Sequence, residues 1–393
     1  STTLRSLSRY NVGQGAVVIA DAKSGEVLAM VGSRDYFDAT EGQVNGCASL
    51  RQPGSTMKPF LYGLALMSGM SLSDLVPDTV VEFPLRDGTS FAPRNYSGTY
   101  HGPTRMREAL ASSFNVAAVH LIDHLGVERF HGLLRQFGFS SLTKGPHHYG
   151  LALGLGAGEV TLLELVNGYR AFACQGFSSA QTCIREVWDR QGRVVGQKAS
   201  ERKRVIPVEV AYLITNVLSD NAARFKAFGI DNPLDLPFAC AVKTGTSKDY
   251  RDNWCVGYTT DYVVGVWVGN FNGAPMQSIS GITGAAPLFR DIMIELHRDR
   301  GPAPFPMPAG LQRSRICAAT GKLVRAGCED QMEELFLVSA VPLDSCYGHE
   351  AHGTRNNGLG NVAERAEAGA DDLVILNPRR GDIYKLDPHV STS

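Results

Sequence analysis

A serine and a lysine stand three residues apart where a long apolar run begins. Ser55 and Lys58 are followed by Pro59–Met67, a run without a charged side chain. Residues three apart share one face of a helix. A lysine that burial or a nearby cation keeps neutral can take the proton of the serine, whose oxygen can then attack a carbonyl carbon. The pair predicts nucleophilic acyl transfer; the alternative is a helix cap beside a surface lysine.

The same serine–x–x–lysine pattern occurs twice more, in settings that do not suit a base. Ser141–Lys144 leads into Gly145–His148, which predicts a loop. Ser200–Lys203 lies in a charged run, where the lysine would be solvated and protonated. Only Lys58 borders an apolar helix that could bury it.

A second lysine opens a lysine–threonine–glycine pattern on a predicted strand. Lys243–Thr246 follows a short apolar run, and Asn253–Tyr258 and Asp261–Gly269 come next. These segments predict three consecutive strands joined by short turns. The pattern can present a cation, a hydroxyl group and a glycine that lets a ligand approach the backbone. The similar Lys23–Gly25 lies between two apolar runs and predicts only a hairpin tip.

The third candidate element is a serine and an asparagine that flank one apolar residue. Ser113 and Asn115 precede the apolar stretch that ends at Ile122. The alternative is a helix cap, a position that serine and asparagine favour. Ser219–Asn221 has the same spacing, but it ends the helix predicted over Val208–Leu218.

The chain resembles a known family in these three elements. With Ser55, Ser113 and Lys243 in this order, it resembles the acyl-serine penicillin-interacting enzymes. Longer segments resemble the transpeptidase domain of bifunctional class A penicillin-binding proteins: Asp21–Gly32, Arg51–Phe60 and Gly154–Ala173. Two more resemble the penicillin-binding protein 1C branch: Asn95–Pro103 and Tyr250–Trp254. The resemblance covers about residues 12–300.

The resemblance implies an α+β fold, in which a central antiparallel sheet is flanked by helices. The order of the elements, with strands at both ends of the domain, favours the same arrangement. The implied function is a peptidoglycan D,D-transpeptidase that crosslinks stem peptides through an acyl-serine intermediate and is inhibited by β-lactams. No cofactor is implied.

The resemblance also implies a role for each site residue. Ser55 would be the nucleophile and Lys58 its base, kept neutral by burial and by Lys243. Ser113 would relay a proton to the leaving amine, and Asn115 would bind Lys58 and the substrate amide. The terminal carboxylate of the substrate would be bound by one strand: Lys243, Thr244, Gly245 and Thr246. The backbone N–H groups of Ser55 and Thr246 would form the oxyanion hole.

Three other activities stay open at this point. Transfer of the acyl group to water would give a D-alanyl-D-alanine carboxypeptidase, or a β-lactamase when the acyl group is an opened lactam. A class A β-lactamase needs a glutamate that activates water, and Glu164 with Asn167 is the nearest imitation. A non-enzyme alternative is a β-lactam sensor or a peptidoglycan-binding scaffold.

The composition is that of a globular protein without a strong excess of positive or negative charge. A formal net charge of −1 over 393 residues predicts neither nucleic acid nor a membrane surface as a partner. The chain begins at a serine, so we expect a fragment or a processed form. Class A relatives carry an amino-terminal membrane helix and a glycosyltransferase domain. The resemblance therefore implies the periplasmic side of the bacterial inner membrane, with that domain and other cell-wall synthesis proteins as partners.

Eight cysteines favour an oxidising compartment. Cys174 with Cys183, and Cys317 with Cys328, could form disulfides; buried thiols are the alternative and suit Cys240 and Cys255. Neither pair has the spacing of a metal site. His147 and His148, and Cys346 with His349, also lack a third and fourth ligand at suitable spacing. We therefore predict no metal.

The expected domain organisation has five parts. Residues 1–10 would be a linker remnant and residues 11–300 the catalytic domain. Residues 301–348 would form a proline-rich linker and a small cysteine-containing appendage. Residues 349–372 would be flexible, and residues 373–393 would be the truncated start of a carboxy-terminal domain.

Overall fold

The computed structural model describes residues 6–84, 88–184, 186–196, 201–229 and 231–346. The segments predicted as flexible and as the start of a carboxy-terminal domain, residues 349–372 and 373–393, lie outside the described residues. The division of the chain at residues 10 and 300 stays a prediction. No helix in the described part is long and apolar enough to cross a membrane.

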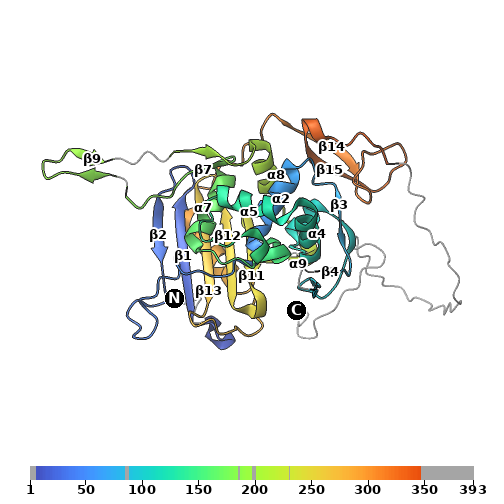
Figure 1. The fold of residues 1–393 in the computed structure, drawn as a ribbon. Coiled ribbons are helices and arrows are strands. Elements are labelled where there is room, and N and C mark those ends of the chain that lie inside the picture. Colours follow the sequence, from blue (N-terminus) through green and yellow to red (C-terminus); the bar gives the residue numbers. More distant parts are fainter. Residues whose placement is uncertain (1–5, 85–87, 185, 197–200, 230, 347–393) are drawn as a thin grey trace, which may run out of the picture. The chain divides into compact units, whose positions relative to one another are not determined.

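The centre of the fold is one antiparallel sheet built from two distant parts of the chain, residues 14–31 and 241–269 (Figure 1). Its strand order is β11-β12-β13-β1-β2, and β1 pairs with β13 in a register that places Val17 opposite Val266. This confirms the predicted α+β fold and the three consecutive late strands. The strands are β1 Gln14–Asp21, β2 Val27–Val31, β11 Ala241–Thr246, β12 Asp252–Tyr258 and β13 Tyr262–Gly269.

Helices cover both faces of this sheet. Side chains alternate between the two faces of a strand, so Trp254 and Cys255 of β12 belong to different cores. The larger core, which contains Trp254, is shared with α2 Lys58–Met67, α4 Asn115–Leu125, α5 Val127–Gln136, α7 Leu162–Ala173 and α8 Val208–Leu218. The smaller core, which contains Cys255, is covered by α10 Ala285–Leu296.

Helix α2 is buried along nearly its whole length, because apolar residues occupy every side of it. The ring of Phe60 packs against four aromatic rings, whose centroids lie within 5.6 Å of its own: those of Phe137, Phe139, Tyr169 and Phe172. Pro59 lies in the first turn, where its missing N–H has no helical partner to lose. The packed aromatic cluster fixes α2, and with it the first residue of the helix, Lys58.

The remaining elements are short. The strands are β3 Leu75–Asp78, β4 Phe83–Pro84, β5 Ser90–Phe91, β6 Gly102–Arg105, β7 Phe177–Ser178, β8 Val187–Trp188, β9 Val194–Gly196 and β10 Lys203–Arg204. The helices are α3 Met106–Ala111, α6 Pro146–Tyr149 and α9 Phe225–Phe228. The 3-10 turns are η1 Ser8–Tyr10, η2 Gly54–Met57, η3 Gly150–Leu155, η4 Lys248–Tyr250 and η5 Val338–Ala340.

A late hairpin packs onto the larger core. It consists of β14 Leu311–Cys317 and β15 Gln331–Leu337. Leu311 and Leu335 are buried in that core, and the guanidinium of Arg107 in α3 lies 2.6 Å from a carboxylate oxygen of Glu334. The hairpin is therefore joined to the helices by both apolar and ionic contacts.

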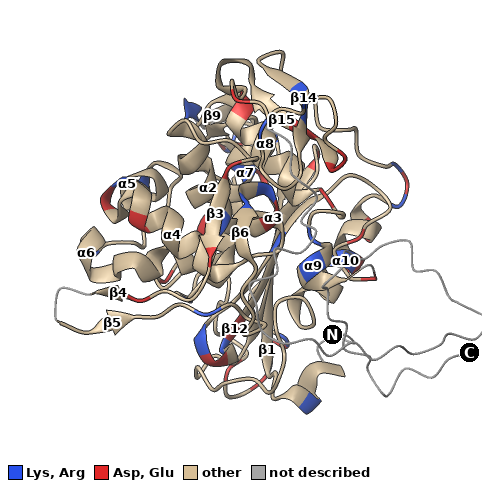
Figure 2. Ribbon diagram, turned by 90° about the vertical axis from the view of Figure 1, so that its right-hand side faces the viewer, with Lys and Arg blue, Asp and Glu red and all other residues tan. Residues whose placement is uncertain are grey.

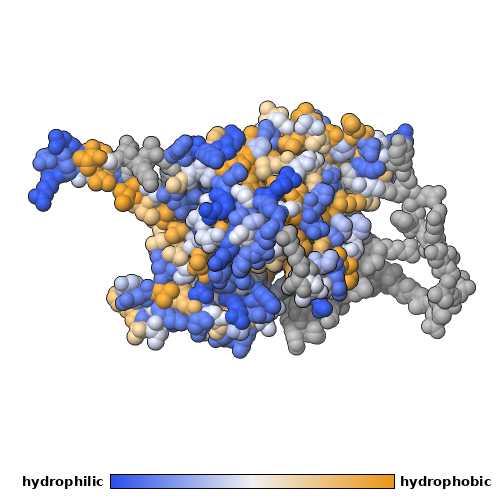
Figure 3. Space-filling model, in the orientation of Figure 1, coloured by the Kyte–Doolittle hydropathy of each residue, from blue (hydrophilic) through white to orange (hydrophobic). Residues whose placement is uncertain are grey.

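The described surface carries both signs of charge and some apolar side chains. Figure 2 shows acidic and basic residues interspersed over the ribbon, in agreement with a net charge of −1. The β8–β9 hairpin exposes Val187, Trp188, Val194 and Val195, and Figure 3 shows orange patches on this side of the structure.

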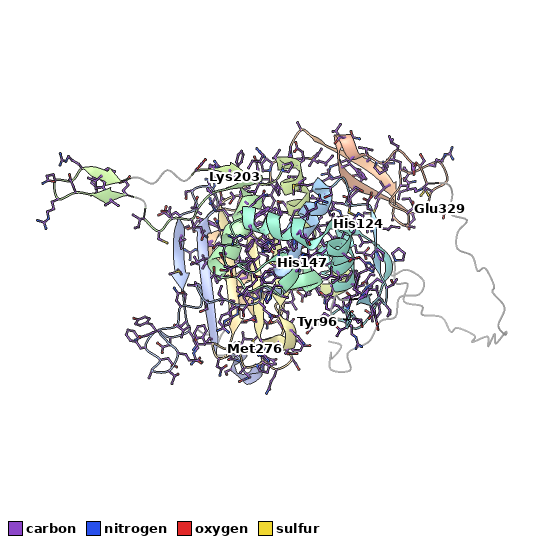
Figure 4. The ribbon with its side chains drawn as sticks, viewed as in Figure 1. Tyr96, His124, His147, Lys203, Met276 and Glu329 are labelled. Carbon is purple, nitrogen blue, oxygen red and sulfur yellow. The ribbon has the colours of Figure 1, made fainter. Side chains whose placement is uncertain are left out.

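The two other serine–x–x–lysine patterns lie apart from any buried base. Lys144 is exposed, and the segment after it is not the predicted loop but the one-turn helix α6, because Pro146 suits a first helical position. Lys203 is exposed on β10 (Figure 4). Lys23–Gly25 forms the hairpin tip between β1 and β2, as predicted.

Candidate active site

Ser55 lies in η2, the 3-10 turn that runs directly into α2. Aromatic side chains of the larger core hold the backbone of this turn. The indole N–H of Trp254 donates to the carbonyl of Gln52 (2.8 Å), and the hydroxyl of Tyr169 donates to the carbonyl of Thr56 (2.7 Å). The serine is half-buried at the end of a rigid support.

Two glycines let the turn and β11 approach each other backbone to backbone. A Cβ on Gly54 would lie 2.6 Å from the carbonyl oxygen of Thr246, and one on Gly245 would lie 2.4 Å from that of Pro53. Gly54 also has a φ of +56°, which favours glycine. The sequence interpretation gave Gly245 the role of admitting a ligand to the backbone. In the structure, the group that Gly245 admits is the carbonyl of Pro53.

Lys58 is fully buried, and its amine is surrounded by oxygen atoms. Nζ donates to the carbonyls of Ser113 (2.6 Å) and Phe114 (3.1 Å) and to the side-chain oxygen of Asn115 (2.7 Å). Burial and then the cation of Lys243 hold the pKa of Lys58 well below its usual range, against the opposing charge of Asp78. A lowered pKa increases the fraction of neutral amine, the form that can accept a proton.

Ser113 stands between the two lysines. Its hydroxyl accepts from Nζ of Lys243 at 2.8 Å and lies 3.4 Å from Nζ of Lys58. Its φ of +62° is a sparsely populated conformation for a residue with a side chain, and such strain is typical of functional positions. Lys58, Ser113 and Lys243 thus form a continuous chain along which a proton can pass.

Lys243 is buried on β11, and its pKa lies near neutral pH. Burial and then the cation of Arg224 lower the pKa of Lys243 to about 7, against the opposing effect of Cys255. Its Nζ also donates to the carbonyl of Thr244 (3.0 Å). The side chain of Arg224 is buried and donates to backbone carbonyls. Arg224 belongs to no sequence motif, so sequence reasoning missed it.

β11 is an edge strand whose free side faces Ser55. The N–H of Ser247 donates to the carbonyl of Asp252 on β12 (2.9 Å). Because hydrogen bonding alternates along an antiparallel pair, the N–H groups of Thr246 and Thr244 point away from β12. The N–H of Thr246 therefore lies on the same open side as Ser55, while the Thr246 hydroxyl accepts from the N–H of Gly281 (3.0 Å).

A buried polar cluster that sequence reasoning missed positions Ser113 and Asn115. The side-chain oxygen of Asn95 accepts from the N–H of Asn115 (2.7 Å), and its amide donates to Asp78 (2.7 Å). His101 lies 2.7 Å from the same carboxylate. The cap of α4 is thus Asn95 rather than Ser113 or Asn115, so the alternative interpretation of those two residues as a helix cap is wrong. Asp78 had no signal in the sequence, since it is an isolated aspartate.

Ser55, Ser113 and the end of β11 line one cleft of about 680 Å³. The rings of Tyr96 and Tyr250 meet across it at 6.1 Å, and Figure 4 marks Tyr96. Apolar walls with a few convergent polar groups are typical of a small-molecule or peptide site. The polar lining includes six of the eight predicted residues: Ser55, Ser113, Asn115, Thr244, Gly245 and Thr246. The two lysines lie behind them, joined to Ser113.

Residues 15–294 match the family described as the penicillin binding protein transpeptidase domain. The chain belongs to this family. It is 33% identical over 314 residues to penicillin-binding protein 1A of Neisseria meningitidis, a match that covers 77% of this chain and 38% of that protein. A match to the Rickettsia bellii protein of the same name is 28% identical and covers 82% and 43%. The chain thus spans about two fifths of the length of these class A relatives.

Solved structures share the fold of this transpeptidase domain. Penicillin-binding protein 1A of Haemophilus influenzae superposes with a TM-score of 0.75 at 24% identity, covering 84% of this chain and 54% of that one. PonA1 of Mycobacterium tuberculosis in complex with penicillin V superposes with a TM-score of 0.66 at 23% identity, covering 78% and 85%.

Glu164 is a helix cap and not a water-activating glutamate. Its carboxylate accepts from the N–H groups of Thr161 (3.1 Å) and Ser141 (2.8 Å), in a capping box at the start of α7. Asn167 accepts from Arg170 (3.3 Å). Neither Glu164 nor Asn167 lines the cleft, so the β-lactamase alternative loses its support.

None of the eight cysteines, all of which are described, is in a disulfide. The two bridges considered from the sequence are therefore not formed in the structure. Cys174 instead donates to the carbonyl of Ala22 (2.9 Å), and Cys183 is exposed. Cys240 and Cys255 are buried thiols, in agreement with the alternative to disulfides that the sequence left open.

We expect the rate at which penicillin acylates Ser55 to pass through a maximum near neutral pH. Lys58 must be neutral to act as a base, so the rate rises with pH through the lowered pKa of Lys58. Lys243 must stay charged to bind a carboxylate, so the rate falls as the pH rises above about 7. Because the lysines interact, the two limbs report pKa values of the pair.

The measurement is the second-order acylation rate constant across the pH range. The matched variant Lys243→Arg is expected to react slowly but to lose the alkaline limb, because an arginine keeps its charge throughout. A native rate that keeps rising to about pH 10, the ordinary range of lysine, would show that neither lysine is perturbed as described.

Proposed function

We propose that the chain is a peptidoglycan D,D-transpeptidase that acts on stem peptides ending in D-alanyl-D-alanine. The observation that carries this proposal is the chain Lys58–Ser113–Lys243 behind a cleft that Ser55 lines. A hydroxyl with two amines of lowered pKa in reach of one cleft is an arrangement for acyl transfer.

In the acylation step, the Ser55 oxygen attacks the carbonyl carbon of the penultimate D-alanine while Lys58 takes the serine proton. The carbonyl oxygen becomes an oxyanion, which the N–H groups of Ser55 and Thr246 stabilise; one such donor contributes about 3–4 kcal/mol. The C–N bond then breaks. The proton passes through Ser113 to the leaving amine of D-alanine, and the ester on Ser55 remains.

Recognition of the terminal carboxylate falls to β11. Lys243 supplies a cation next to Ser113, and Thr244 is among the residues that line the cleft. A bound carboxylate would raise the pKa of Lys243 and keep it charged. A β-lactam carries a carboxylate and a reactive carbonyl in the same relation, so it would acylate Ser55 in the same way and act as a covalent inhibitor.

In the second step, an amine of a neighbouring stem peptide attacks the ester and the crosslink forms. The position of Glu164 argues against a class A β-lactamase, because the helix cap holds this carboxylate outside the cleft. A D-alanyl-D-alanine carboxypeptidase is the second candidate, and a β-lactam sensor or peptidoglycan-binding scaffold is the non-enzyme candidate.

The test is incubation with a pentapeptide ending in D-alanyl-D-alanine and an acceptor amine, followed by mass spectrometry of the peptides. We expect a crosslinked product that is absent with Ser55→Ala. A product trimmed by one D-alanine, without crosslinks, would establish the carboxypeptidase instead. Penicillin labelling of Ser55 without either product would favour the sensor or scaffold.

The setting in the cell follows from the class A relatives. We propose that the chain works on the periplasmic side of the bacterial inner membrane, beside a glycosyltransferase domain of the full-length protein and other cell-wall synthesis proteins. The segments Asn95–Pro103 and Tyr250–Trp254 support placement in the penicillin-binding protein 1C branch. Both segments border the cleft, at Tyr96 and Tyr250.

A further inference from the structure

Three cysteine thiols meet at the end of the β14–β15 hairpin, away from the active-site cleft. Cys317, Cys328 and Cys346 are all buried, and their sulfur atoms all lie within 4.8 Å of one another. In the described part of the chain, no other group of three His, Cys, Asp or Glu side chains is gathered in this way. Figure 4 marks Glu329, the neighbour of Cys328, at this end of the structure.

Backbone pairing brings the three cysteines together from distant positions. Cys317 is the last residue of β14 and begins a tight turn, in which its carbonyl accepts from the N–H of Gly321 (2.9 Å). Leu323 then accepts from the N–H of Cys346 (2.7 Å). Cys328 sits in the next turn, before β15, and its N–H donates to the carbonyl of Arg325 (3.1 Å).

The turns that carry the three cysteines have few apolar side chains around them. The three cysteines form a separate buried cluster, and among the described residues Val324 is the partly buried apolar residue packed against it. Small loop-rich units of this kind need a crosslink or a metal, because burial of so little surface cannot offset the entropy of ordering the loops.

We propose that Cys317, Cys328 and Cys346 bind a structural zinc ion as thiolates. A tetrahedral zinc ion with Zn–S bonds of about 2.3 Å places its sulfur ligands about 3.8 Å apart, which lies inside the observed limit. Thiolates select zinc over magnesium or calcium, which prefer oxygen. The three cysteines supply three ligands. The fourth coordination position of the zinc ion would be filled by another side chain or by water.

A zinc ion accounts for all three thiols, whereas a disulfide accounts for two. A disulfide would leave the third thiol within reach of the bond, in position for thiol–disulfide exchange. The spacing of these cysteines in the sequence does not match a short metal-binding motif, so it predicted no metal. The fold brings the three cysteines together. A Cβ on Gly321 would lie 2.2 Å from the carbonyl oxygen of Ser73, so the turn after Cys317 rests on the transpeptidase fold. The zinc ion would hold this end of the β14–β15 hairpin in place against the transpeptidase fold.

The experiment measures zinc bound to the full 393-residue chain, purified without metal-affinity steps, by elemental mass spectrometry. We expect about one zinc ion per chain, lost by about tenfold or more in Cys317→Ser, Cys328→Ser and Cys346→Ser. Cys183→Ser, an exposed cysteine outside the cluster, is the matched control and should keep its zinc. Penicillin labelling reports whether each variant has folded.

Cobalt substitution of the native chain decides the question without a variant. Cobalt bound by thiolates gives an intense sulfur-to-metal charge-transfer absorption, and we expect this band together with release of zinc when a mercurial reagent titrates the thiols. Zinc that stays unchanged in the three serine variants would overturn the proposal. So would native protein that has no zinc, gives no cobalt band and carries a disulfide among the three cysteines.

Discussion

Replacing Ser55 with alanine is expected to abolish covalent labelling by fluorescent penicillin. The lactam carbonyl can form a stable ester only with a hydroxyl that a base has activated, and the Ser55 hydroxyl is the one set in the rigid turn beside Lys58. The loss should be complete, because the bond itself cannot form. Fluorescence of the denatured protein on a gel measures it.

The chain supplies matched controls for this variant. Ser141 and Ser200 precede Lys144 and Lys203 at the same spacing, and both lysines are exposed. Ser141→Ala and Ser200→Ala should therefore label as the native chain does. Persistent labelling of Ser55→Ala, or its loss in either control, would place the nucleophile elsewhere.

Replacing Lys58 with methionine is expected to slow acylation by about 10²–10⁴-fold, the usual contribution of a general base. Methionine fills a similar volume but cannot take the Ser55 proton. It also leaves the carbonyls of Ser113 and Phe114 without their donor, so the loop that carries Ser113 would shift. The second-order rate constant for penicillin, measured with a thermal unfolding curve of the same sample, separates chemistry from folding.

Lys144→Met is the control for the second prediction, since Lys144 is exposed and has the same position in a serine–x–x–lysine pattern. It should acylate at the native rate. A folded Lys58→Met variant that reacts within about tenfold of the native chain would remove Lys58 from the role of base.

Much of the fold and of the site could be predicted from the sequence. The strands after Lys243 and the helix after Lys58 have strong apolar patterns, and the same patterns separate Lys58 from the exposed Lys144 and Lys203. The joining of β1 to β13 follows from the order of strands and helices along the chain. The apolar patterns depend on local composition, which sequence reasoning reads well, and the pairing of β1 with β13 is the one long-range contact that the order of elements indicated.

The remaining features depend on contacts between distant segments. Asp78 and Asn95 support Asn115 through buried hydrogen bonds that no spacing reveals. Gly245 admits the carbonyl of Pro53, a contact known only once β11 and the nucleophile turn are placed together. Backbone pairing likewise gathers three cysteines whose separation in the sequence gave no metal pattern.

The most direct test of the central claim is the intact mass of the native chain after exposure to penicillin, followed by mapping of the adduct. The account predicts one penicillin added per chain, carried as an ester by the peptide that contains Ser55. A folded protein whose mass stays unchanged, or an adduct mapped to any other residue, would contradict it.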